Sequence, residues 1–133
     1  MKKFVIALIA TILLLPSIAT AQSKTICNFR MGQMKLNHAS NGYNIELNTN
    51  HSWDDDYIKI YLGEKEDAIK LLDAMIEFNA YDLRWSFADH YGEMFGFKKT
   101  KVNISITKSG YYGNAYTTNN ELKRVRKMIV KQK

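Results

Sequence analysis

Apolar residues occupy every second position in several stretches of this chain, the spacing of strands that bury one face. The clearest stretches are 43–47, 58–62, 83–87 and 102–106. Residues 112–117 follow a Ser-Gly turn signal and predict a returning strand, while residues 25–36 predict an edge strand or an extended arm. The polar stretch 49–56 predicts the loop of a hairpin between two of these strands.

Two other stretches have apolar residues at helical spacing. The first follows Gly63, carries acidic residues in its first turn and should end near Asn79, a residue that tolerates a left-handed cap. Its apolar positions are Ala68, Leu71, Leu72, Met75 and Phe78. The second begins at a capping box formed by Thr118 and Glu121 and predicts a terminal helix.

The order of these elements, strands then helix then strands then helix, predicts an α+β fold. We expect one mainly antiparallel sheet of about five strands, in the order ββ(β)-α-βββ-α, with both helices on one face. No proline follows Pro16 and no repeat is visible, so residues 22–133 should form a single domain. The sheet and the first helix should share one core made of Ile58, Ile60, Leu71, Leu72, Met75, Trp85 and Phe87.

The first 21 residues have the pattern of a cleaved secretory signal peptide. Lys2 and Lys3 precede an apolar run at 4–15, and Ala19-Thr20-Ala21 supplies the small residues that a signal peptidase recognises. The run is shorter than the roughly 20 residues that cross a bilayer, so we expect cleavage after Ala21 and no transmembrane segment in the mature protein. The expected compartment is the periplasm or the exterior of a bacterium.

Charge and cysteine content exclude some classes of protein. Removal of Lys2 and Lys3 with the signal peptide leaves 17 basic and 13 acidic residues, a net charge of +4. This excess is smaller than that of dedicated nucleic-acid binders, so we expect no nucleic-acid partner. Cys27 is the only cysteine and forms no internal disulfide. It is expected to be a small core residue, with an intermolecular disulfide or a nucleophile beside His90 or His38 as alternatives.

Histidines and carboxylates in two turns raise the possibility of a metal site. His51 precedes the acidic triplet 54–56, and His90 lies between Asp89 and Glu93. These spacings match no known metal motif, so we expect solvated turns, no metal and no other cofactor. The alternative function is a small metal-assisted hydrolase that uses His51, His90 and nearby carboxylates.

Tyrosines on the polar faces of the strands are the best candidates for ligand contacts. Tyr57 and Tyr61 alternate with core residues and flank Lys59, and the first helix should cover the opposite face of their strand. Further candidates are Tyr111, Tyr112 and Tyr116. Aromatic rings with a polar tip suit sugars and protein surfaces, although tyrosine is also favoured in strands for packing alone.

The terminal helix offers a second candidate surface because it is strongly basic. Its charged residues include Lys123, Arg124, Arg126 and Lys127. Such a helix binds anionic lipid or an acidic partner, or it simply presents a solvated face.

Taken together, these patterns favour a small exported binding domain without catalytic chemistry. Its expected partner is an envelope protein or a polysaccharide. An inhibitor-like protein that acts through protein contacts is the other alternative, and the sequence does not separate the two.

Overall fold

The structure is a computed structural model that describes residues 23–49, 57–111 and 113–133. The first half of the chain forms the strands β1 (Lys24–Phe29), β2 (Met34–Ala39), β3 (Gly42–Asn48) and β4 (Tyr57–Gly63), followed by the helix α2 (Lys65–Glu77). The second half forms β5 (Arg84–Ala88), β6 (Met94–Lys99), β7 (Ile104–Lys108) and β8 (Ala115–Thr117), followed by α3 (Asn119–Lys131). A short 3-10 turn, η1 (Arg30–Gly32), joins β1 to β2.

The α+β class and the antiparallel pairing are confirmed, but the strands form two sheets. Each sheet has four strands in chain order, β1-β2-β3-β4 and β5-β6-β7-β8, where we expected one sheet of about five strands. Residues 25–36 are divided between two strands by the turn at Arg30–Gly32, and β6 was not predicted. The chain therefore runs twice through four antiparallel strands and a helix, a repeat of element order that the sequence does not display.

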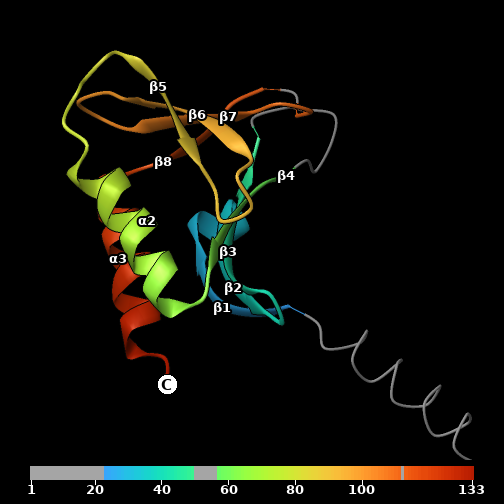
Figure 1. Cartoon of the computed structure of the whole chain (residues 1–133). Coiled ribbons are helices and arrows are strands. Elements are labelled where there is room, and N and C mark those ends of the chain that lie inside the picture. Colours follow the sequence, from blue (N-terminus) through green and yellow to red (C-terminus); the bar gives the residue numbers. More distant parts are fainter. Residues whose placement is uncertain (1–22, 50–56, 112) are drawn as a thin grey trace, which may run out of the picture.

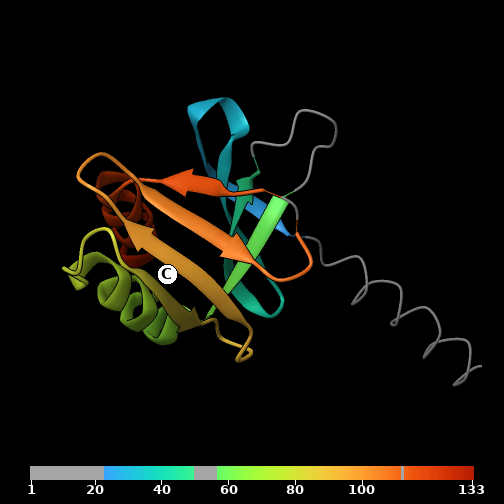
Figure 2. The same ribbon diagram turned by 90° about the horizontal axis from the view of Figure 1, so that it is seen from above.

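The two sheets and the two helices enclose a common core. The strands of the second sheet run across those of the first, and α2 and α3 lie side by side next to the first sheet (Figure 1). Viewed from above, the second sheet lies over one end of the helix pair (Figure 2). Apolar residues of both sheets and both helices meet in this core. They include Ile45, Leu72, Phe97 and Val125, which are all fully buried.

The predicted core is largely correct, with Trp85 as the exception. Ile58, Ile60, Leu72 and Met75 are fully buried, whereas Leu71 and Phe87 are only partly buried against the core. Trp85 is 51% exposed, so its assignment to the core was wrong. The physical reason is that β5 forms the margin of its sheet, where the Phe78 ring lies tilted by 43° against the Trp85 ring at 5.5 Å between centroids.

The end of α2 is fixed by a buried lysine. The helix ends at Glu77 and Phe78 is extended, so the predicted left-handed end at Asn79 does not form. Lys99 enters from β6 and donates to the carbonyl oxygens of Met75, Ile76 and Phe78 at 3.3, 3.0 and 2.7 Å. A cation at this position satisfies carbonyls that the helix leaves unpaired and complements its dipole.

The start of α3 follows the prediction in part. The Thr118 side chain accepts a hydrogen bond from the Glu121 backbone N–H at 3.1 Å, as expected for the N-cap. The predicted capping box pairs the Glu121 carboxylate with the Thr118 backbone N–H. In the structure this carboxylate contacts Thr117 and Arg30 instead. Glu121 therefore joins α3 to the β1–β2 turn through Arg30 and to β8 through Thr117.

Gly63 allows the close approach of the two halves of the chain. Its φ of +84° lies in the left-handed region, and a Cβ there would lie 2.5 Å from His90 Nδ1. The His90 backbone N–H donates to the Tyr61 carbonyl at 2.7 Å. The turn between β5 and β6 is thereby held against the end of β4.

Candidate functional site

The outer face of the first sheet carries the predicted residues Tyr57, Lys59 and Tyr61. They alternate along β4 with Ile58, Ile60 and Leu62, which are buried in the core. The strand register places further polar side chains beside them. We call this surface the tyrosine–lysine face, made of Lys35, Asn37, Asn44, Glu46, Tyr57, Lys59 and Tyr61.

Hydrogen bonds hold the middle of the tyrosine–lysine face in place. The Asn37 Nδ2 group donates to Asn44 Oδ1 and to Glu46 Oε1, both at 3.0 Å. Thr25 Oγ1 donates to Asn37 Oδ1 at 2.9 Å, and Lys59 Nζ lies 3.5 Å from Glu46 Oε1. Asn37 and Asn44 are buried, so this network meets the hydrogen-bonding needs of groups that water does not reach.

Lysines lie over both tyrosine rings. Lys35 Nζ is 5.2 Å from the centroid of Tyr57, and Lys59 Nζ is 5.9 Å from that of Tyr61. Lys108 approaches Tyr61 from the second sheet, at 5.6 Å. These distances are those of cation–π contacts, which fix the orientation of the rings and place positive charge beside them.

Lys108 belongs to a buried ion network between the two sheets. Its Nζ lies 2.6 Å from Glu93 Oε2 and 3.3 Å from Asp89 Oδ2, and it donates to the Lys59 carbonyl at 2.8 Å. Asp89 also accepts from the backbone N–H groups of Tyr91 and Glu93. Burial disfavours the charged lysine, but its hydrogen bonds and the carboxylate charges outweigh that effect and raise the Lys108 pKa.

Tyr111 and Tyr116, two of the other predicted tyrosines, do not lie on this surface. Tyr116 lies on β8, opposite Ser105 in the second sheet, and Tyr111 packs partly against the core. Tyr112 lies outside the described residues. Tyr57 and Tyr61 are therefore separated from Tyr116, because β4 and β8 belong to different sheets.

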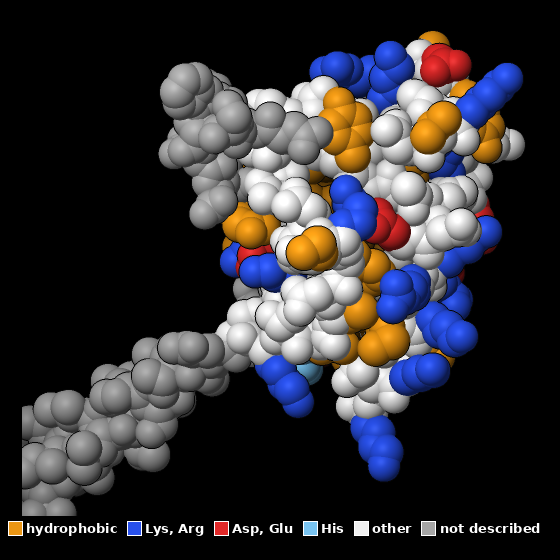
Figure 3. Space-filling model, turned by 180° about the vertical axis from the view of Figure 1, so that it is seen from behind, with side chains coloured by type: hydrophobic (Ala, Val, Ile, Leu, Met, Phe, Trp, Pro, Cys, Tyr) orange, Lys and Arg blue, Asp and Glu red, His pale blue; other side chains and the backbone are white. Residues whose placement is uncertain are grey.

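The predicted basic surface on α3 is only partly free. Lys123, Arg124 and Lys127 are exposed, and Figure 3 shows lysine and arginine side chains spread over one side of the molecule. Arg126 instead forms two hydrogen bonds to Asp73 of α2, at 2.6 and 3.4 Å. The Arg124 guanidinium lies 5.2 Å from the centre of the Phe29 ring.

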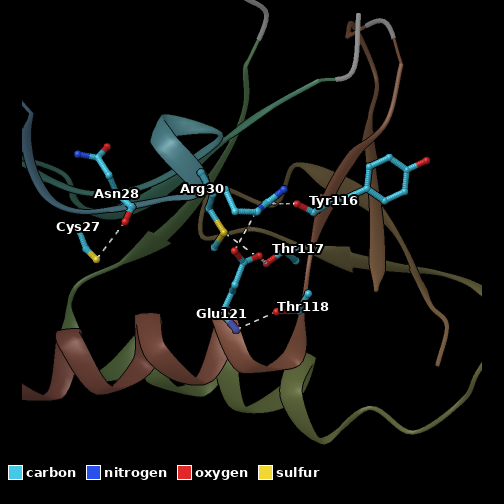
Figure 4. Close-up of polar contacts among 8 residues, drawn as sticks. Cys27, Asn28, Arg30, Tyr116, Thr117, Thr118 and Glu121 are labelled. Atoms are coloured by element: carbon cyan, nitrogen blue, oxygen red, sulfur yellow. Dashed lines mark hydrogen bonds and ion pairs between the residues drawn. The ribbon is translucent and has the colours of Figure 1, made fainter. Parts of the chain in front are cut away.

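Among the residues considered for metal binding, Asp89 and Glu93 both contact Lys108, in the turn that also carries His90. His90 Nδ1 is 3.8 Å from an Asp67 oxygen, and His51 falls in the undescribed segment 50–56. Within the described ranges, no three His, Cys, Asp or Glu side chains form a group suited to a metal ion. Cys27 is half-buried against the core, and its Sγ lies 3.7 Å from the Asn28 carbonyl (Figure 4).

Arg30 is a structurally important residue that the sequence analysis missed. Figure 4 shows its side chain reaching from the β1–β2 turn to α3 and β8, where it contacts Glu121 Oε2 at 2.9 Å and the Tyr116 carbonyl at 2.6 Å. Arg30 and Met31 both have positive φ values, 48° and 57°, which is uncommon for residues with a side chain. The Gly32 that follows was the only sequence signal of this turn.

No protein family model matches this chain, and neither the curated proteins nor the solved structures gave a match. In the described part of the chain, no helix has the length and apolar character needed to span a membrane.

Proposed function

We propose that the protein is an exported, non-catalytic domain that binds an extended envelope polysaccharide on the tyrosine–lysine face. The observation that supports this is the ordered row of carboxylate, ammonium and tyrosine groups along the outside of the first sheet, in which the buried Asn37 amide holds Glu46 in place. The partly exposed Glu46 and Lys59 supply an acceptor and a donor for sugar hydroxyls, and the exposed parts of the tyrosine rings supply apolar contact area.

The chemistry of this face favours a sugar chain over a protein surface. Protein interfaces are usually centred on exposed apolar or aromatic side chains that become fully buried. Tyr57 and Tyr61 are half-buried and already lie under lysines, and the exposed Tyr91 ring meets Tyr61 edge-on at one end of the face, at 5.0 Å between centroids. A polar ligand gains more from this surface, because its hydroxyl groups replace water on side chains that are already positioned.

The length of the face also fits an extended ligand. Tyr57 and Tyr61 stand four residues apart on β4, which corresponds to about 13 Å at the usual rise of a strand. Lys59 and its partner Glu46 lie between them. A chain of sugar units lying along β4 would meet a ring at each end and a charged pair in the middle.

Co-sedimentation with insoluble polysaccharide tests this proposal. Wild-type protein should be retained by purified peptidoglycan or by another envelope polysaccharide from a defined panel. The double variant Tyr57→Ala, Tyr61→Ala should lose most of this retention while keeping the circular dichroism of the wild type. Tyr81→Ala, which removes an exposed tyrosine elsewhere, is the matched control and should bind normally.

Two results would contradict the proposal. Equal retention of the double variant and the wild type would place the ligand on another surface. Failure of every polysaccharide to bind, together with capture of an acidic protein that the double variant does not capture, would favour the protein-binding alternative for this same face.

A further inference from the structure

Among the described strands, β5 is the sheet edge that has neither a bulge nor a contact that covers it. At the margin formed by β4, the carbonyls of Lys59 and Tyr61 accept from Lys108 Nζ and from the His90 backbone N–H. Arg30 donates to the Tyr116 carbonyl of β8, and β1 contains a bulge and contacts α3. Such contacts and bulges are common protections of edge strands.

The pairing of β5 is regular and one-sided. Its five residues stand opposite five residues of β6 without a shift in register, and β6 is its only strand neighbour in the described sheets. The opposite edge of β5 therefore presents backbone N–H and C=O groups in the geometry of a strand that accepts another strand.

Exposed apolar side chains gather around this edge. Leu83 and Trp85 are 58% and 51% exposed, and the nearby Tyr81, together with Met94 opposite Ala88 on β6, is similarly exposed. The alternation along β5 places Trp85 and Phe87 on one face of the sheet and Arg84, Ser86 and Ala88 on the other. An open edge with apolar groups around it favours contact with another polypeptide, since burial of this area is the main gain of such an interface.

We propose that the occupant of this edge is a second copy of the same chain, whose β5 pairs antiparallel with the first about a two-fold axis at Ser86. Pairing about Ser86 uses all five residues of the strand. It places Ser86 opposite Ser86, Arg84 opposite Ala88 of the second copy, and Trp85 opposite Phe87 of the second copy.

The side chains of β5 complement themselves in this register. Trp85 and Phe87 form two cross-strand aromatic pairs on one face, which stabilise antiparallel strands. Arg84 is the only charged residue of β5, and it meets Ala88, so no like charges are opposed. The two second sheets become one continuous sheet, and the interface closes with two copies because both contribute the same surface.

This dimer leaves the tyrosine–lysine face accessible, because that face belongs to the first sheet. A dimer presents two such faces, and a long repeating polysaccharide that spans both would bind it more tightly than one copy. The dimer itself does not depend on the proposed function, and a monomer with normal polysaccharide binding would overturn only the dimer.

Sedimentation equilibrium over a wide concentration range tests the pairing, with the chain that begins at Gln22 and contains every described element. The wild type should show twice the mass of one chain at high concentration. Ser86→Lys places two like charges on the two-fold axis and should raise the dissociation constant at least tenfold. Ser40→Lys, the same change in the exposed β2–β3 turn, should leave the dissociation constant unchanged.

Cross-linking provides a second measurement, in which folded variants report which residues of the two copies lie close together. In a Cys27→Ala background, Ser86→Cys should give a covalent dimer with a short thiol cross-linker. Arg84→Cys and Ala88→Cys should cross-link more efficiently when mixed than when each is treated alone. A wild type that is monomeric at every concentration would overturn the inference, and so would cross-linking that does not follow this register.

Discussion

At the scale of single residues, the most informative feature is a pair of lysines on the core side of the second sheet. Lys99 donates to the last carbonyls of α2, and Lys108 binds Asp89 and Glu93 between the sheets. Burial, and to a lesser extent the nearby charge of Lys123, lowers the pKa of Lys99, whereas its carboxylate partners raise the pKa of Lys108. Both lysines replace water with protein oxygens, which is how a buried cation becomes tolerable.

We expect Lys108→Met to destabilise the protein by about 3–5 kcal/mol, because it leaves a buried carboxylate without its cation. The side chains of Lys108 and Asp89 are 6% and 0% exposed, so water does not replace the lost contact. Glu93→Gln is the control. The Glu93 carboxylate is half-exposed, so this change should lower the free energy of unfolding by less than about 1 kcal/mol. Urea unfolding measures both changes, and equal small losses would show that the network is only a surface contact.

The raised pKa of Lys108 also predicts a pH dependence. The folded protein holds this proton more tightly than the unfolded chain, whose lysine titrates near 10.5. The stabilisation is therefore fully present below that pH and is lost as the pH rises through the folded-state pKa. Unfolding curves between neutral and strongly alkaline pH should show this decline in the wild type and a weaker one in Lys108→Met.

At the scale of elements, buried apolar faces hold both helices against the sheets, and one ion pair joins the helices to each other. α2 buries Ala68, Leu72 and Met75 toward the sheets, and α3 buries Leu122, Val125 and Ile129. The Arg126–Asp73 pair joins the two helices at the surface, where such pairs contribute little. Most of the helix packing energy therefore comes from the apolar faces.

Leu72→Ala should cost about 2–5 kcal/mol of unfolding free energy, since Leu72 is fully buried between the helix and the sheets. Leu71→Ala, one position away on the same helix, should cost clearly less because Leu71 is only partly buried. Thermal and urea unfolding of both variants provide the comparison. A loss below about half a kilocalorie for Leu72→Ala would contradict the buried face assigned to α2.

At the scale of the whole molecule, the chain repeats one arrangement of four strands and a helix, and the strands of the second sheet run across those of the first (Figure 1). Long-range contacts hold the halves together, and several involve backbone groups. His90 donates to the Tyr61 carbonyl, Lys108 to the Lys59 carbonyl and Arg30 to the Tyr116 carbonyl. These contacts occupy sheet margins and position the tyrosine–lysine face relative to the second sheet.

We expect added zinc or calcium to leave the melting temperature of the protein unchanged, because neither histidine turn has the ligand spacing of a known metal motif. An ion that bound only the folded state would raise the melting temperature. Differential scanning fluorimetry with and without a chelator makes the comparison. A rise that is lost in His51→Ala or His90→Ala would contradict the non-catalytic proposal and favour a metal-assisted hydrolase.

Local patterns predicted much of the fold because they depend on neighbours in the chain. The alternation at 58–62 places Ile58 and Ile60 in the core, and the spacing around Leu72 gives the buried face of α2. The N-cap at Thr118 depends only on residues within one turn. The strand β6 was missed because Lys98 and Lys99 hide its apolar alternation, and Lys99 is buried only through the distant end of α2.

The candidate site was predictable only in part. Alternation along β4 is a local property, so the sequence alone determined that Tyr57, Lys59 and Tyr61 lie opposite the core residues of that strand. It also determined the helix positions and the α+β class, since hydrophobic period sets which side of each element is buried. The division into two sheets, the lysines over the tyrosine rings and the open margin of β5 were decided by tertiary structure, because each depends on which distant segments become neighbours.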